Sequence, residues 1–297
     1  MPTDASSVGA RTFANRGIFL VVAAALLWSS GGLIVRLLSG IDSWTIVFWR
    51  SLSAFGFLAA FGLITEGRSY LNAFLAMRWP TLAIALCYVV ASISLIVALK
   101  LTTVADVLIL MSCAPLLAAL LGRIVLGESL GVLGWIALTG SILGAGIMVS
   151  DSYAHGSITG DIVAMGIALA QAVAIVMFRR HREISLIPGI SLAMLIAAGA
   201  VAPLASFAPI APREAGLIGL FGAGQLGLGL ALFASGARLI PAAQTAMFGV
   251  LEPVVGPVWV WLALGETPSP AGLLGGAIVI AALVIFTLST MRSAPAT

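Results

Sequence analysis

The sequence predicts an all-α polytopic membrane protein with ten transmembrane helices in two inverted five-helix repeats, and three observations support this prediction. Of the 297 residues, 61% are hydrophobic and only 8% are charged, whereas a soluble domain carries about 25% charged residues. Apolar stretches long enough to cross a bilayer recur along the whole chain. Finally, Ala105, Pro115, Gly127, Glu128 and Gly134 recur 138 positions later as Ala243, Pro253, Gly265, Glu266 and Gly272.

The apolar stretches between loop signals give the predicted spans in order. A hydrocarbon core about 30 Å thick takes about 20 apolar residues per helix, so the chain can supply roughly ten spans. The first stretch follows Arg11 and Arg16, as the apolar part of a signal peptide would, but it lacks a clear cleavage site and is interpreted as a retained helix. The predicted spans are 17–39, 43–65, 75–99, 103–125, 130–150, 159–179, 187–207, 214–236, 241–263 and 269–290.

The domain organisation follows from these spans. The first five form a repeat at 17–150, and the last five form a second repeat at 159–290. The polar stretch 151–160 is predicted to be the loop between the repeats, and tails are predicted at 1–16 and 291–297. Little of the chain is left for a soluble domain.

The basic residues predict the orientation. Positively charged side chains collect in short cytoplasmic loops. A cytoplasmic N-terminus places only Arg36, Lys100 and Arg213 on the outer side. It places ten on the inner side: Arg11, Arg16, Arg68, Arg78, Arg123, Arg179, Arg180, Arg182, Arg238 and Arg292. Both tails are therefore predicted to be cytoplasmic, in a protein of the bacterial inner membrane.

The parity of the spans predicts that the repeat is inverted. Each half holds an odd number of spans, so the second copy must begin on the other side of the membrane. Glu128 then lies on the cytoplasmic side and its counterpart Glu266 lies outside. Inverted repeats of this kind are the architecture of many secondary transporters, which rock about a central site.

Two prolines mark the helices that recur most closely. Pro115 and Pro253 each lie about 12 residues into their spans, which at 1.5 Å per residue places them about 18 Å deep, near the midplane. A proline inside a helix removes a backbone hydrogen bond and loosens the helix. The functional interpretation is a pair of hinges that bend during alternating access, and the structural alternative is a static kink fixed by packing.

A glutamate stands at the end of each of these two helices. Glu128 and Glu266 follow a glycine at the predicted ends of the fourth and ninth spans. A carboxylate at such a position can cap the N-terminus of the next helix, which is our first interpretation. The second is a gate contact that breaks when the protein opens.

A basic and an acidic residue are predicted at membrane depth. Arg50 and Glu252 lie at similar depths in the second and ninth spans, and unpaired charges there cost several kcal/mol. One hypothesis joins them in a structural ion pair. A rival has Glu252 facing the pathway, where it binds an amino group or a proton, and a third has Arg50 reaching outward to Asp106 or Asp42.

Other polar and aromatic residues in apolar context are candidates for binding a substrate. A zwitterionic substrate needs donors for its carboxylate and acceptors for its ammonium group, and an aromatic side chain needs an apolar wall. Hydrogen bonding between helices, or simple packing, is the alternative role for each residue. The candidates are Trp28, Ser29, Tyr88, Ser92, Met111, Gln171, Gln225, Gln244 and Met247.

Several classes of function find no support in the sequence. Gly222, Gly224 and Gly227 spell GxGxxG but lie inside an apolar helix with no preceding strand, so close helix packing explains them better than a dinucleotide. A phosphate-binding loop is absent, and both histidines, His155 and His181, fall in predicted loops. Catalytic residues, a metal, a cofactor and a nucleic-acid partner are therefore not expected.

The paired motifs carry a resemblance to a known family. The segment 98–130, with Ala-Leu-Lys, Pro115 and Gly-Glu, and the segment 236–267, with Leu-Glu-Pro and Leu-Gly-Glu, resemble the paired EamA repeats of the drug/metabolite transporter superfamily. Trp28 and the Phe-Trp-Arg stretch at 48–50 are similar to the usual opening of the first repeat, whereas Gln171 stands at the position of Trp28 in the second. The resemblance covers nearly the whole chain.

The resemblance implies an exporter of small metabolites that works by alternating access and is not an enzyme. Within the superfamily the chain is most similar to the YddG-like aromatic amino acid exporters, which implies amino acids, including aromatic ones, as substrates. Drugs and other metabolites such as nucleobases are the alternative, and an intramembrane enzyme is the alternative from another class. The expected partners are the substrate and the lipid bilayer, and a monomer and a homodimer are both open.

Overall fold

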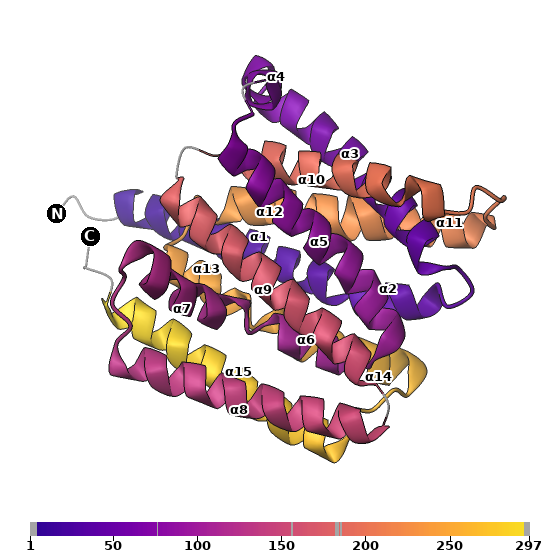
Figure 1. Cartoon of the computed structure of the whole chain (residues 1–297). Coiled ribbons are helices and arrows are strands. Elements are labelled where there is room, and N and C mark those ends of the chain that lie inside the picture. The colour runs from indigo at the N-terminus through magenta and orange to yellow at the C-terminus, as the bar shows by residue number, and fades with distance from the viewer. Residues whose placement is uncertain (1–4, 76, 156, 182–183, 185, 294–297) are drawn as a thin grey trace.

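The computed structural model describes residues 5–75, 77–155, 157–181, 184 and 186–293, all of which lie in helices or short connections (Figure 1). The first half contains α1 Ala5–Ser29, α2 Gly31–Leu37, α3 Ser43–Thr65, α4 Arg68–Leu75, α5 Trp79–Leu101, α6 Val104–Met111, α7 Ala114–Leu126 and α8 Val132–His155. The second contains α9 Ile158–Arg180, α10 Leu186–Val201, a 3₁₀ turn Ala202–Leu204, α11 Pro212–Gly219, the π-helix η2 Leu220–Leu228, α12 Gly229–Gly236, α13 Ala242–Phe248, α14 Leu251–Leu264 and α15 Pro270–Ser293.

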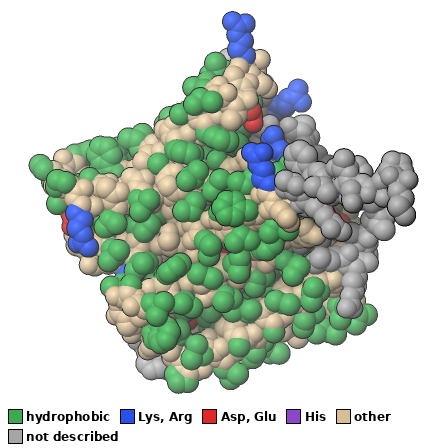
Figure 2. All heavy atoms as spheres, turned by 180° about the vertical axis from the view of Figure 1, so that it is seen from behind, with side chains coloured by type: hydrophobic (Ala, Val, Ile, Leu, Met, Phe, Trp, Pro, Cys, Tyr) green, Lys and Arg blue, Asp and Glu red, His purple; other side chains and the backbone are tan. Residues whose placement is uncertain are grey.

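These helices make ten crossings of the molecule. Within the described residues, nine segments are long and apolar enough to span a bilayer. The remaining crossing consists of α13 and α14. Of these two helices, α14 is apolar but shorter than the nine candidate spans. Large apolar side chains cover the outside, and Figure 2 shows a face dominated by hydrophobic groups with few charged ones. The predicted polytopic membrane protein is confirmed.

The path of the chain makes the two halves an inverted pair. Successive crossings alternate in direction, and the start of α1 and the end of α15 lie at one end of the bundle, which we name the termini end (Figure 1). The first repeat begins there with α1, whereas the second begins with α9 at the other end, which we name the opposite end. The inversion predicted from the odd number of spans is confirmed.

The structure differs from the prediction at the edges of the spans. A short helix, α4, occupies the expected loop between the second and third spans, where Tyr70 packs onto Gly62. The expected loop 151–160 is mostly helical because α8 runs through Asp151 to His155 and α9 begins at Ile158. Residues 5–16 of the predicted N-terminal tail continue α1. Residues 1–4 and 294–297 of the tails, and Arg182 of the orientation argument, lie outside the described residues.

Small residues hold the fifth and tenth spans together. The long helices α8 and α15 lie side by side, and a Cβ atom on Gly144 would stand 2.6 Å from the backbone oxygen of Gly275. Gly140 faces Ala282 of the same helix pair, whereas Gly276 faces Ile109 of α6. The two symmetry-related helices therefore touch at their backbones, within one chain.

Candidate substrate pathway

Three crossings are interrupted near the middle, at what we name the mid-span breaks. They lie at Ser30 between α1 and α2, at 112–113 between α6 and α7, and at 249–250 between α13 and α14. The Ser30 and Ser112 hydroxyls each donate to a backbone carbonyl three residues earlier, at 2.7 Å. Such bonds compete with the regular helical pattern and bend helices.

The two prolines stand just after symmetry-related breaks. Pro115 is the second residue of α7 and Pro253 is the third residue of α14. Because proline has no N–H, the backbone oxygens of Met111 and Gly249, four residues earlier, lose their helical donor. The structure thus shows interrupted helices at both prolines, and their movement as hinges stays a prediction. A third proline, Pro257, lies inside α14 and has Ala119 at its counterpart in α7.

The eighth crossing is irregular in a different way. Its middle, η2, is a π-helix, a form that frequently occurs at functional sites. Gly222 packs directly against the backbone oxygen of Arg50 in α3, and Gly227 packs against Phe57 of the same helix. The glycines of the GxGxxG sequence therefore serve close helix packing at these two positions.

The break at Ser30, the π-helix and α14 meet around a small polar cluster. The Gln225 amide nitrogen of η2 donates to the Trp28 backbone oxygen at 3.0 Å, and Trp259 of α14 donates its indole N–H to the Ser29 hydroxyl at 3.0 Å. Phe233 lies against the Trp28 ring, with the ring centroids 5.2 Å apart. We name Trp28, Ser29, Gln225, Trp259 and Phe233 the central cluster.

Two polar atoms of the central cluster have no partner. The Trp28 indole nitrogen and the Gln225 side-chain oxygen are buried and form no hydrogen bond within the described part of the chain. Buried polar groups are nearly always hydrogen-bonded in native proteins. The cluster therefore contains one unpartnered donor and one unpartnered acceptor together with aromatic rings.

Glu252 lies beside this cluster. It is the second residue of α14, and Gly256, one turn later on the same face, contacts the Ser29 backbone oxygen and Leu108. The Glu252 side chain is half-buried and forms no hydrogen bond or ion pair with the residues that the structure describes. A carboxylate is thus held next to the mid-span breaks without a protein partner.

The structure does not contain the hypothesised pair of Arg50 and Glu252. The Arg50 guanidinium donates to the Ser92 hydroxyl at 2.8 Å and lies 4.3 Å from the Phe221 ring centroid, so it packs among α3, α5 and η2. The outward reach to Asp42 or Asp106 is also absent among the described contacts. Asp42 accepts from the Thr45 N–H at 2.9 Å, and Asp106 accepts from the Thr103 hydroxyl at 2.6 Å.

The other candidate residues are spread over several helices. Tyr88 of α5 faces Phe178 of α9, and Ser92 holds Arg50. Met111 ends α6 at its break, whereas Met247 of α13 is 43% exposed. The Gln171 and Gln244 side chains form no hydrogen bond with described residues. The structure brings together Trp28, Ser29 and Gln225, and it joins Arg50 to Ser92.

An apolar groove runs along α14 and α15. It encloses about 450 Å³ and is lined by side chains that include Ile109, Pro253, Pro257, Trp261, Leu273 and Ile280. Both prolines of α14 face this groove, so this broken helix is not tightly packed against α15 along its whole length.

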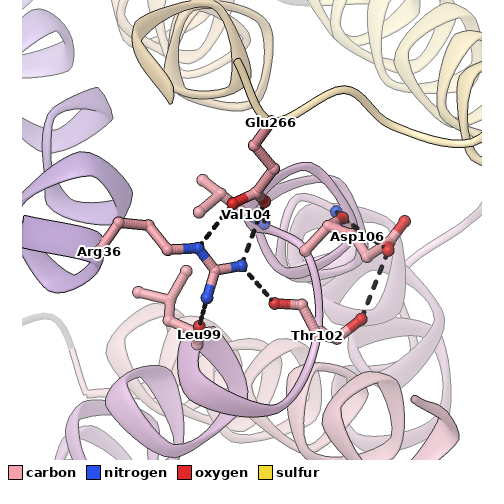
Figure 3. A network of polar contacts seen from close by, with 7 residues as sticks. Arg36, Leu99, Thr102, Val104, Asp106 and Glu266 are labelled. Carbon is pink, nitrogen blue, oxygen red and sulfur yellow. Dashed lines mark hydrogen bonds and ion pairs between the residues drawn. The ribbon is translucent and has the colours of Figure 1, made fainter. Parts of the chain in front are cut away.

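A dense ion-pair network lies at the opposite end (Figure 3). Arg36 of α2 forms a bidentate pair with Glu266, with nitrogen to oxygen distances of 2.7 and 3.1 Å. The same guanidinium donates to the backbone oxygens of Leu99 and Thr102, and Glu266 also accepts from the Val104 N–H at 2.9 Å. Three crossings of the first repeat thus converge on one carboxylate of the second.

A simpler ion pair lies at the termini end. Arg179 of α9 donates to the Glu128 carboxylate at 3.0 Å. Our first interpretation, in which Glu128 and Glu266 cap the helix that follows, is wrong. Each carboxylate instead binds an arginine of the other repeat, and Ser269 accepts from the Gly272 N–H to cap α15.

Sequence reasoning missed both arginines and Trp259. One signal could have revealed the arginines, because Arg36 and Arg179 lie 143 positions apart, the same offset that relates Trp28 to Gln171. Trp259 carried no comparable signal, since its counterpart in the first repeat is Leu121.

Comparison with known proteins agrees with this architecture. The EamA-like transporter family matches residues 15–150 and again residues 158–288. The chain belongs to the EamA-like transporter family. The family match covers both repeats, and it establishes a membrane transporter of the drug/metabolite type rather than any particular substrate.

A solved structure shows the same fold as this EamA-like chain. A crystal structure described only as that of a protein is 19% identical, covers 93% of this chain and 98% of its own, and superposes with a TM-score of 0.66. No curated protein matches the chain. The resemblance to the YddG-like group stays a prediction.

Proposed function

We propose that this EamA-like protein is a secondary transporter that exports small metabolites across the bacterial inner membrane by alternating access, and that its substrates are amino acids, including aromatic ones. The observation that carries the proposal is the central cluster, which lies beside the mid-span break at Ser30 and joins it to the π-helix and to α14. In transporters with inverted repeats, substrate sites lie near the midplane where helices are discontinuous.

The chemistry of the cluster supports an amino acid substrate. The unpartnered Trp28 N–H is a donor for a carboxylate, and the unpartnered Gln225 oxygen is an acceptor for an ammonium group. The free Glu252 carboxylate, close by, adds an acceptor of opposite charge to an ammonium group. Trp28, Phe233 and Trp259 supply apolar surface that suits a large side chain.

The orientation is part of the proposal. Among the described residues, the chain segments at the termini end carry more basic residues than those at the opposite end, which carry Arg36, Lys100 and Arg213. The positive-inside rule therefore favours a cytoplasmic termini end.

Transport into liposomes tests the proposal. Purified protein in vesicles loaded with one unlabelled amino acid should accumulate the same labelled amino acid by counterflow, with aromatic ones among the fastest. Trp28→Ala should lower counterflow of aromatic amino acids about tenfold, the effect of about 1.4 kcal/mol of lost contact. Trp79→Ala is the matched control, since Trp79 is 72% exposed on the outer surface.

The outcomes separate the alternatives. Counterflow of a nucleobase or a drug without any amino acid would refute the substrate class and keep the transporter. An equal loss in Trp28→Ala and Trp79→Ala would refute the central cluster as the binding site.

A further inference from the structure

We propose that two symmetry-related ion pairs are the gates of the transport cycle. The opposite-end clasp, Arg36 with Glu266, holds the opposite end shut, and the termini-end clasp, Arg179 with Glu128, holds the termini end shut. The cycle releases them in turn. This inference rests on the alternating access proposed above, but it concerns residues remote from the central cluster.

The positions of the four residues follow the internal symmetry. The two glutamates are 138 positions apart and each follows the glycine that ends its broken helix, with φ of +71° at both Gly127 and Gly265. The two arginines are 143 positions apart, near the ends of the first helices of their repeats. The two clasps thus occupy symmetry-related positions in the two repeats.

Each clasp joins one repeat to the other. Arg36 belongs to the first repeat and Glu266 to the second, whereas Glu128 belongs to the first and Arg179 to the second. When inverted repeats rock about a central site, one end closes as the other opens. A contact between repeats at an end must therefore break when that end opens, and the two clasps cannot both remain closed throughout the cycle.

The two clasps lie toward opposite ends of the bundle. Arg36 lies eight residues beyond Trp28, a rise of about 12 Å toward the opposite end. Arg179 lies eight residues beyond Gln171, which puts it at a similar height toward the termini end. Both clasps are closed in this structure.

The two clasps differ in strength. The opposite-end clasp is bidentate and linked to two backbone carbonyls and one N–H, and its side chains are 23% and 26% exposed. The termini-end clasp has one contact at 3.0 Å, and its side chains are 40% and 45% exposed. Bidentate, partly buried pairs are stronger than exposed single ones. The opposite end is therefore the more firmly closed in this protein.

Thr102 connects the opposite-end clasp to two acidic side chains. Its backbone oxygen accepts from Arg36, while its hydroxyl donates to Asp161 at 2.9 Å and lies 3.4 Å from Asp106. Lys100 at the same end donates to the backbone oxygens of Leu38, Ser39 and Ile41. Of these charged groups, Arg36 and Glu266 alone form a direct ion pair between the repeats.

Cysteine accessibility from each side of the membrane tests the proposal. The reporter is Ser30→Cys at the mid-span break, in a background with Cys87→Ser and Cys113→Ser, and the probe is a membrane-impermeant maleimide applied to either face of sealed vesicles. Glu266→Gln should raise labelling from the opposite-end face about fivefold and lower it from the other face. Glu128→Gln should do the reverse.

Matched variants control for the loss of a carboxylate. Glu214→Gln at the opposite end and Glu66→Gln at the termini end change carboxylates that form no ion pair among the described residues, and they should leave labelling unchanged. At the termini end, where the clasp side chains form no backbone hydrogen bond among the described residues, the exchanged pair Arg179→Glu with Glu128→Arg should bring labelling back toward that of the parent.

The results distinguish failure of the gates from failure of the proposed function. Labelling that rises equally from both faces, or does not change, refutes the gates even if amino acids are transported. Opposite shifts in the two variants support the gates even if every amino acid fails in counterflow, in which case only the substrate proposal falls. Thermal unfolding of each variant confirms that folded protein is compared.

Discussion

Replacing Glu252 by Gln should lower transport at least about tenfold without lowering thermal stability. Glu252 forms no hydrogen bond or ion pair with the residues that the structure describes, so the substitution removes no protein contact. It also removes the cost of holding a charge in the interior, which favours the folded state. Loss of transport together with an unchanged or higher melting temperature would assign the carboxylate to substrate or proton binding.

The pH dependence of counterflow separates these two roles. If Glu252 carries a proton in the cycle, the parent rate depends on pH and the rate of the Gln variant does not. If it binds the ammonium group of the substrate, the variant is slow at every pH. Flux by Glu252→Gln equal to that of the parent across pH would exclude both roles, and Glu66→Gln is the control at a carboxylate distant from the central cluster.

Replacing Gly222 by Ala should destabilise the protein by about 1–3 kcal/mol. The added methyl group would overlap the Ser53 hydroxyl and the backbone oxygen of Arg50. A backbone atom cannot rotate away, so α3 and η2 must separate and the Arg50 guanidinium must shift on Phe221. Interiors are close-packed, and such shifts spread to neighbouring side chains.

Thermal unfolding in detergent measures this effect. Gly219→Ala is the matched control, because a methyl group there has no heavy atom of another residue within 4 Å. A melting temperature for Gly222→Ala equal to that of the control would contradict the close contact between α3 and η2.

The order of the helices and their inversion could be predicted because the signals are long and repeated. Each span extends over about 20 residues, and Pro115 and Pro253 fix the relation between the halves. The short helix α4 could not be predicted, because it is held by Tyr70, which packs onto Gly62 of α3. The break at Ser30 could not be predicted either, because a serine inside a helix does not always bond a backbone oxygen of the preceding turn as Ser30 bonds that of Leu27.

The residues of the candidate site could be predicted from the sequence, but most of the contacts between residues could not. Trp28, Ser29 and Gln225 stood out as polar or aromatic residues in apolar helices, and they do meet. Arg50 and Glu252 were paired by depth alone, yet depth does not determine the face of a helix, and Arg50 turns toward Ser92. Glu266 binds Arg36, 230 residues away, instead of the next helix, and no local pattern specifies such a partner.

The unequal clasps have a thermodynamic consequence. Two repeats with identical contacts would make the inward-open and outward-open states equal in free energy, apart from the membrane itself. In the proposed cycle, the additional bonds around Arg36 favour the state that is closed at the opposite end, so we expect unloaded carriers to accumulate in the state that opens at the termini end. Detailed balance nevertheless forbids a passive carrier from favouring net flow in one direction. In a passive carrier such an asymmetry sets the substrate concentration that half-saturates each face, and the concentration gradient determines the direction of net flow.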